Sequence, residues 1–123
     1  MKRREIDSIN ENFRMNKKVV LITGAALIGK RFYEVLAKSG ILGLMRYLAA
    51  YYAGKHIRVN ALSPGGIYNQ DDEWFETVYP ERTMLRRMAN IDDLDGAILF
   101  LASDASKYVT GTNLIIDGGW TAW

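Results

Sequence analysis

Two apolar stripes between residues 28 and 53 constrain the fold of this 123-residue chain more than any other feature. The first stripe consists of Ile28, Phe32, Val35 and Leu36, and the second of Ile41, Met45, Leu48 and Tyr52. At about 100° per residue, the second stripe lies roughly 200° around a helix axis from the first. We therefore expect two helices joined at Lys38-Ser39-Gly40, because glycine permits a break and each helix then covers a different part of a sheet. The alternative is one long helix that is buried on both faces.

Three short segments have the composition of β-strands. Residues 18–23, KVVLIT, form a continuous β-branched run, which is typical of a strand buried on both faces of a parallel sheet. Residues 56–62, HIRVNAL, alternate apolar with polar side chains, and residues 113–117, NLIID, form the third segment. We expect the motif SPGG at residues 63–66 to end the second strand sharply, because proline cannot donate to a ladder.

Helical patterns separate these strands. Residues 70–79, QDDEWFETVY, predict a short surface helix, in which Trp74 and Phe75 form either a flap over a site or a packing contact. Asn90 is a good N-cap for a helix from Ile91 to about Ser103. The alternation predicts an α/β protein whose three parallel strands lie in the order first, second, third, with the last strand as an exposed edge. An exposed edge is a pairing site, so we expect a homodimer.

Composition narrows the functional classes. Sixteen Lys and Arg residues against fourteen Asp and Glu leave a net charge of +2, which is too small to indicate nucleic-acid binding. The chain has no cysteine, which excludes disulfides, thiol chemistry and cysteine-based metal sites, and we predict no metal. Neither a spanning segment of roughly 20 apolar residues nor a signal peptide is evident. We expect a polar leader over residues 1–17, one domain over 18–123, and a cytoplasmic location without membrane attachment.

A glycine turn follows the first strand. Gly24 is followed by AALIGK, and the helical pattern begins near Ile28. A strand, a glycine turn and a helix together aim the N–H groups of the helix N-terminus at a phosphate. The two glycines, Gly24 and Gly29, stand where a dinucleotide loop ordinarily has three, so the residues alone leave phosphate binding and a plain turn both open. The single histidine, His56, is interpreted as a surface residue.

Three blocks of sequence resemble the short-chain dehydrogenase/reductase family. They are VVLITGAALIG, KSGILGLMRYLAAYYAGKHIRVNALSPGG and LRRMANIDDLDGAILFLASDASKYVTGTNLIIDGGW, and the last two resemble the carboxyl-terminal half of such an enzyme in family order. The resemblance implies that residues 18–123 form a reduced Rossmann-like fold, a small three-stranded parallel sheet with flanking helices. It also implies NAD or NADP as the cofactor and a small carbonyl or alcohol as the substrate.

The resemblance assigns roles to individual residues. Thr23, Gly24 and Gly29 match the cofactor loop of the family, although TGAALIG is one residue short and lacks the middle glycine. Lys38 matches the family lysine, which holds the cofactor ribose and lowers the pKa of a catalytic tyrosine. Pro64, Gly65 and Ile67 match positions near the nicotinamide carboxamide.

The chain departs from the family at the catalytic tyrosine. It is about half the length of a full family member, and the resemblance implies an internal loss of the second to fifth strands together with the catalytic serine. The family tyrosine lies four residues before the lysine, but Glu34 holds that position here. Tyr33 lies five residues before Lys38, roughly 140° away around a helix. The expected function is therefore an NAD(P)-dependent oxidoreductase that is impaired or inactive as this shortened chain.

Two other interpretations remain open. The first is a non-enzymatic interaction module, because family members associate through the elements that correspond to Ile91–Ser103 and Asn113–Asp117, and both are intact here. Such a chain would pair with itself or cap a full-length relative. The second is a deletion product without function.

Overall fold

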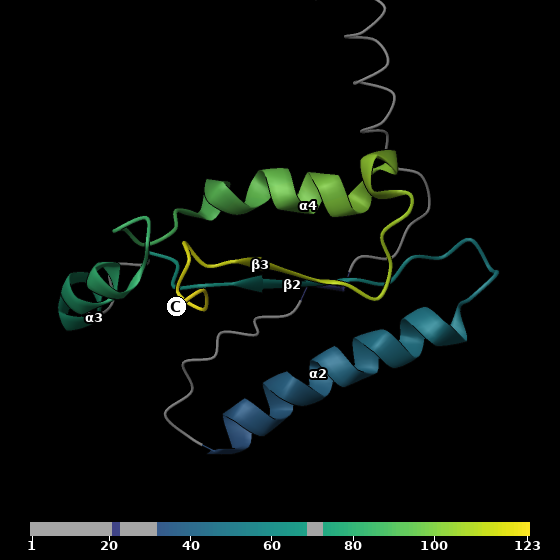
Figure 1. Ribbon diagram of the computed structural model, residues 1–123, viewed down its shortest axis with the longest axis horizontal. Helices are drawn as coiled ribbons and strands as arrows, with labels where there is room; N and C mark the ends of the chain where they lie inside the picture. The colour runs from purple at the N-terminus through teal and green to yellow at the C-terminus, as the bar shows by residue number, and fades with distance from the viewer. Residues whose placement is uncertain (1–20, 23–31, 69–72) are drawn as a thin grey trace, which may run out of the picture.

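The computed structural model describes residues 21–22, 32–68 and 73–123, and the side chains of 21–22, 32–36, 38 and 74 lie outside this description. The elements are β1 (Leu21–Ile22), α2 (Phe32–Tyr51), β2 (Ala61–Pro64), α3 (Glu73–Val78), α4 (Asp95–Ala102) and β3 (Asn113–Ile116). Short 3-10 helices lie at Pro80–Arg82, Ile91–Leu94 and Asp104–Ser106. In Figure 1, α4 covers one side of the strands, α2 lies on the other, and α3 lies near the end at which the strands finish.

The described strands form one parallel sheet. Its order is β1-β2-β3, with Leu21 opposite Ala61 and Leu62 opposite Leu114. The predicted α/β class, the parallel pairing and the strand order are thus confirmed. Of the first strand, predicted over residues 18–23, only residues 21–22 fall within the described part.

The second strand begins and ends later than the sequence predicted. It was expected over residues 56–62, but β2 runs from Ala61 to Pro64, so the strand does end within the SPGG motif, two residues later than predicted. The N–H groups of Ala61 and Gly65 both donate to the β3 side, to Thr112 and Ile116 at 2.9 and 2.8 Å. Since alternate residues face opposite neighbours, the missing N–H of Pro64 would have faced the β1 side, where the described pairing stops at Leu62. Pro64 therefore removes no hydrogen bond from the described pairing between β2 and β1.

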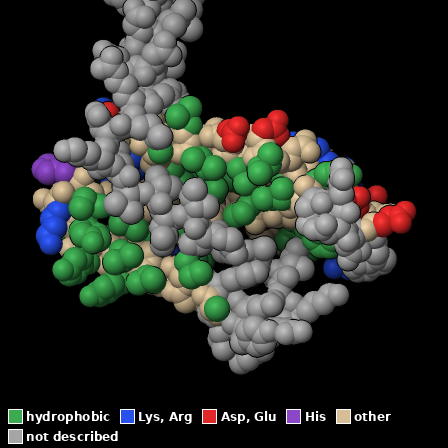
Figure 2. Space-filling view, turned by 180° about the vertical axis from the view of Figure 1, so that it is seen from behind, with side chains coloured by type: hydrophobic (Ala, Val, Ile, Leu, Met, Phe, Trp, Pro, Cys, Tyr) green, Lys and Arg blue, Asp and Glu red, His purple; other side chains and the backbone are tan. Residues whose placement is uncertain are grey.

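A single helix replaces the two that the apolar stripes predicted. α2 is continuous over 20 residues, and Gly40 is not among the glycines with positive φ, so no break occurs there. Glycine costs only about 1 kcal/mol in a helix interior, and the neighbouring leucine, alanine and lysine residues favour helix. The prediction of a break at Gly40 was wrong. The alternative of burial on both faces also fails for the described side chains, because Leu44, Tyr47 and Tyr51 are 51%, 64% and 56% exposed, and Figure 2 shows apolar side chains along this helix at the surface.

The second apolar stripe of α2 packs on the sheet as expected. Met45 is fully buried and forms a core cluster with Val59 and Ala61. The partly buried residues that pack against this cluster are Leu42, Leu48, Ala49, Tyr52 and Ile57. The first stripe lies outside the described side chains. One face of α2 therefore holds the helix on the sheet.

The predicted last helix begins with a tight turn. Residues 91–94 are 3-10 and continue directly into α4. The N–H of Asn90, at the N-cap position, donates to the carboxylate of Asp93 at 2.8 Å, which completes half of a capping box. The predicted N-cap and helix are confirmed. The predicted helix over residues 70–79 is shorter, because α3 begins at Glu73, and residues 69–72 lie outside the described part.

Two polar side chains of the segment before β2 are buried. Arg58 and Asn60 are 8% and 0% exposed. The Arg58 guanidinium donates to the carbonyls of Leu101, Ser103 and Val109 at 2.8, 3.1 and 3.2 Å. Asn60 donates to the Val109 carbonyl at 3.0 Å and accepts from the Thr112 N–H at 3.1 Å. Arg58 therefore satisfies carbonyls at the C-terminal end of α4, which helix geometry leaves unpaired.

Candidate functional site

The loop after β2 lies at the carboxyl edge of the sheet, where open α/β folds bind their ligands. Ile67 pairs with Ala89 in an isolated parallel bridge. The Ala89 N–H donates to the Gly66 carbonyl at 2.9 Å, and the Tyr68 N–H donates to the Ala89 carbonyl at 2.8 Å. Residues 83–90 form the connector between the 3-10 helices Pro80–Arg82 and Ile91–Leu94. The Leu85 N–H donates to the Gly118 carbonyl at 3.1 Å, which ties this connector to the end of β3. Two loops and one connector therefore meet at this edge.

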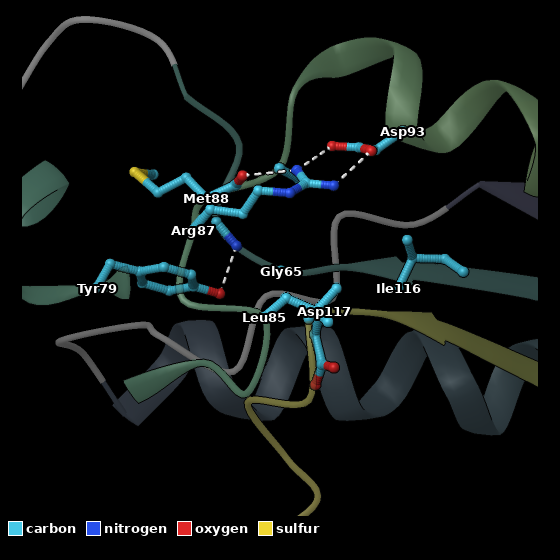
Figure 3. Close-up of a pocket in the computed structure, with 11 residues that line it drawn as sticks. Gly65, Tyr79, Leu85, Arg87, Met88, Asp93, Ile116 and Asp117 are labelled. Carbon is cyan, nitrogen blue, oxygen red and sulfur yellow. Dashed lines mark hydrogen bonds and ion pairs between the residues drawn. The ribbon is translucent and has the colours of Figure 1, made fainter. Parts of the chain in front are cut away.

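Tyr79, the residue that follows α3, packs against the place where these segments meet. It is 3% exposed, and its ring stacks on Trp120 with centroids 4.5 Å apart and planes 10° apart. Phe75 contacts the same ring at 4.9 Å. The Tyr79 hydroxyl accepts the N–H of Gly66, as the dashed line in Figure 3 shows. Burial raises the pKa of Tyr79, and the charge of Asp117 adds to the rise, while the Gly66 hydrogen bond opposes it. The phenol therefore stays protonated, and its oxygen serves as the acceptor of the Gly66 N–H.

A small pocket of about 120 Å³ lies between these segments. Figure 3 shows its lining, which comes from the loop after β2, the connector and the end of β3, together with Tyr79 and Asp93. The lining residues are Gly65, Gly66, Tyr79, Leu85, Arg87, Met88, Ala89, Asp93, Ile116, Asp117 and Gly118. A cavity of this size accepts a few heavy atoms and is smaller than the pockets of about 300–1,000 Å³ that hold whole ligands. It is suited to one functional group of a larger molecule.

An ion pair forms one wall of the pocket. Arg87 donates to both carboxylate oxygens of Asp93, at 2.5 and 2.9 Å, and to the Met88 carbonyl at 3.0 Å. The hydrogen bond from Arg87 and that from the Asn90 N–H lower the pKa of Asp93 to about 2. The same pair raises the pKa of Arg87. Both groups are therefore charged at neutral pH, and the bidentate pair fixes the connector against the start of the last helix.

Asp117 ends β3 at the opposite wall. Burial alone would raise the pKa of its carboxyl group, but hydrogen bonds from Thr121 and Gly119 outweigh burial and lower it. The Thr121 hydroxyl donates at 2.7 Å, the Thr121 N–H at 3.0 Å and the Gly119 N–H at 2.9 Å. The carboxylate is thus occupied in holding the turn that follows β3.

One backbone donor of the loop remains available. The N–H groups of Gly65, Gly66 and Tyr68 donate to Ile116, Tyr79 and Ala89. Among the described residues, the N–H of Ile67 has no acceptor. With its other donors occupied, this loop is able to offer a ligand one N–H rather than the ring of N–H groups that holds a pyrophosphate.

Some of the site residues predicted from the sequence lie in the described part of the structure, and others lie wholly or partly outside it. Gly65 lines the pocket, and Pro64 and Ile67 flank it on the same loop. Lys38 and Tyr33 both belong to α2, although their side chains lie outside the description. Thr23, Gly24 and Gly29 lie outside the described residues altogether. The structure therefore describes only the carboxyl-edge group, and the assigned roles remain predictions.

Sequence reasoning missed the side chains that shape the pocket. Tyr79 was placed only as the last residue of a surface helix, although its spacing of four from Phe75 is the signal of a shared helix face. Asp117 was placed at a strand end, and adjacent parallel strands bring such ends together. The Phe75 contact favours the packing interpretation of the aromatic pair at residues 74–75, at least for Phe75.

A protein-family model described as Enoyl-(Acyl carrier protein) reductase matches residues 18–121. The chain belongs to the short-chain dehydrogenase/reductase family. A D-arabinitol 2-dehydrogenase (ribulose-forming) of Candida tropicalis is 40% identical over 96 residues, which is 72% of this chain and 34% of that enzyme. This short-chain dehydrogenase/reductase thus spans about a third of the curated relatives that it matches.

Solved structures of the family share the fold. A short-chain dehydrogenase of Leptospira borgpetersenii with bound NAD+ has a TM-score of 0.77 and 39% identity, covering 85% of this chain and 44% of that one. A gluconate 5-dehydrogenase of Burkholderia cenocepacia in complex with NADP and tartrate has a TM-score of 0.76 and 30% identity, covering 94% and 49%. The described part of this short-chain dehydrogenase/reductase contains no group of three or more potential metal ligands, and none of its described helices is long and apolar enough to cross a membrane.

Proposed function

We propose that the chain is an NAD(P)-binding oxidoreductase of the short-chain dehydrogenase/reductase type whose hydride transfer is impaired in this shortened form. The observation that carries the impairment is the continuity of α2 from Phe32 to Tyr51. In an unbroken helix, Tyr33 lies about 140° around the axis from Lys38, and the position four residues before Lys38 is Glu34. Tyr33 is therefore badly placed to have its pKa lowered by Lys38 and to exchange a proton with a substrate.

The loop after β2 supports cofactor binding. NAD+ and NADP occupy solved structures of similar chains, and the resemblance sets Pro64, Gly65 and Ile67 near the nicotinamide carboxamide. The available N–H of Ile67 fits that role, because an amide oxygen is an acceptor. The cofactor, NAD or NADP, would supply or accept hydride, with a small carbonyl or alcohol as its partner. The cytoplasmic location expected from the sequence remains part of this proposal.

A thermal melt followed by circular dichroism tests cofactor binding. We expect a cooperative transition that moves to higher temperature with millimolar NADH or NADPH, because a ligand that binds only the folded state stabilises it. Ile67→Pro removes the N–H that the cofactor needs and should abolish the shift, whereas Ile67→Val keeps that N–H and should retain it. A transition that ignores both cofactors in the unmodified chain contradicts binding.

A turnover assay tests the impairment separately. We expect no oxidation of NADH or NADPH with small carbonyl substrates. Cofactor-dependent reduction that survives purification and disappears in Tyr33→Phe would overturn the proposal, since it would show that Tyr33 reaches the reacting atoms.

A second candidate function is a non-enzymatic interaction module. It is favoured by the position of β3 at the edge of the sheet that the described strands form, where Ile115 is 47% exposed. It is also favoured by Ile91 and Leu99 on the preceding helical segment, which are 77% and 43% exposed. Unpaired strand edges and exposed apolar side chains are both pairing surfaces. Self-association would then use residues Ile91–Ser103 and Asn113–Asp117, without nucleic acid or membrane.

Light scattering after size-exclusion chromatography tests this candidate. Self-association should give a dimer that Ile115→Lys converts to a monomer, while Tyr108→Lys, at a fully exposed position outside β3, leaves it intact. A monomer at all concentrations, alone and mixed with a full-length relative, would count against an interaction module.

A further inference from the structure

A second hollow, separate from the pocket of Figure 3, lies beside the turn that follows β3. It has a volume of about 460 Å³ and is lined by Glu81, Arg82, Trp120 and Trp123. None of these four residues lines the smaller pocket. The hollow is shallow and open to solvent, so it suits a ligand that lies against its floor rather than one that it encloses.

Both indole rings of this hollow are held in place. Trp120 stacks on the buried ring of Tyr79 at 4.5 Å. The Trp123 indole N–H donates to the Arg82 carbonyl at 3.1 Å, although Trp123 is 74% exposed. A ring that is fixed and exposed loses little conformational freedom when a ligand covers it. The two indoles therefore give the hollow an apolar lining whose rings are already held in place before a ligand binds.

The charged side chains of the hollow select among ligands. Glu81 is exposed and lies 3.3 Å from the guanidinium of Arg86, and Arg82 is exposed beside it. The lining thus carries one carboxylate and one guanidinium, so neither an anion nor a cation meets a surface of a single charge sign. A neutral ligand whose rim carries hydroxyl groups gains an acceptor from Glu81 and a donor from Arg82.

We propose that this hollow binds a neutral monosaccharide in its pyranose form. One face of such a ring carries C–H groups, which the negative faces of the indoles attract, and its rim carries hydroxyls for Glu81 and Arg82. The proposal depends neither on NAD(P) nor on any residue of α2. Its failure and the failure of the proposed oxidoreductase function are therefore distinguishable.

Nuclear magnetic resonance of the indole N–H groups tests the proposal, with D-galactose and D-glucose as probes. We expect saturable shifts of the Trp120 and Trp123 signals at millimolar sugar. Trp123→Ala should weaken binding at least about tenfold and Glu81→Gln by a smaller factor, whereas Tyr108→Ala, which removes a fully exposed aromatic ring elsewhere, should leave it unchanged.

Three outcomes would overturn the assignment. The first is the absence of any saturable shift in the folded unmodified chain. The second is equal binding by Trp123→Ala. The third is binding of sodium gluconate or choline in place of the neutral hexoses, which would show that charge rather than a hydroxylated ring governs this site.

Discussion

The N–H of Gly66 donates to the hydroxyl of Tyr79 at 2.5 Å, which joins the loop after β2 to a ring that lies between Phe75 and Trp120. This one contact connects α3, the carboxyl edge of the sheet and the turn after β3. The pocket at that edge therefore depends on an aromatic stack as much as on the strands.

Tyr79→Phe should lower the free energy of unfolding by about 1–3 kcal/mol, because it leaves the N–H of Gly66 without its acceptor while keeping the ring. Urea denaturation followed by fluorescence measures the change. Tyr108→Phe is the matched control, since Tyr108 is fully exposed. Equal effects of the two substitutions would show that the Gly66 contact contributes nothing.

Gly66→Ala should destabilise the fold by about 1–3 kcal/mol, the usual cost of overpacking. A Cβ at this position would lie 2.7 to 2.9 Å from three atoms of the Tyr79 ring, which is itself held on both sides. Gly96→Ala is the control, and we expect it to change the free energy of unfolding in the opposite direction. Its Cβ meets nothing within 4 Å in α4, so replacing glycine in the helix should stabilise by up to about 1 kcal/mol. Urea denaturation of both variants checks the signs, and a neutral Gly66→Ala would contradict the packing described.

Arg58→Met should lower the free energy of unfolding by at least about 2 kcal/mol, because hydrogen bonds to charged groups each contribute about 1.5–3 kcal/mol. The variant leaves the carbonyls of Leu101 and Ser103 without this donor at the end of α4. Arg46→Met, at an exposed position on α2, supplies the control. Chemical denaturation compares the two, and a loss no larger than that of Arg46→Met would exclude Arg58 as a determinant of stability.

Acid should weaken the fold partly through Asp93. Its pKa is lowered from 3.8 to about 2 in the folded chain, so the contribution of the Arg87 pair is fully present above pH 4 and is lost as pH falls toward 2. Asp93→Asn should flatten the dependence of the urea midpoint on pH in this interval, and the lowered pKa of Asp117 should leave some dependence in the variant. Asp95→Asn, at an exposed position in the first turn of α4, is the control. Equal flattening in both variants would contradict the assignment to Asp93.

The fold class was predictable because its signals are local. The β-branched run at residues 18–23, the alternation before β2 and the N-cap at Asn90 each follow from short-range preferences, and they yielded the parallel order that the sheet shows. The continuity of α2 through Gly40 was not predictable in this way. Opposed apolar stripes indicate two packing surfaces, but they do not show whether one helix or two helices carry them.

The candidate site was predictable only in its backbone. Gly65 and its neighbours were assigned through the family resemblance of their loop, whereas Tyr79 reaches Gly66 from 13 residues away through packing that no local pattern records. Arg58 illustrates the same limit. A polar residue in an alternating strand pattern suggests an exposed face, yet its guanidinium is buried because distant carbonyls of α4 and the following loop need donors.

Because α2 is unbroken, the number of residues between Tyr33 and Lys38 alone decides how far this pair departs from the tyrosine–lysine spacing of the family. In a continuous helix, the direction of one side chain relative to another depends only on the number of residues between them. Removing one residue between Tyr33 and Lys38 would turn the tyrosine by about 100° and leave it four positions before the lysine. As far as this pair is concerned, a single codon separates the present arrangement from that of the family.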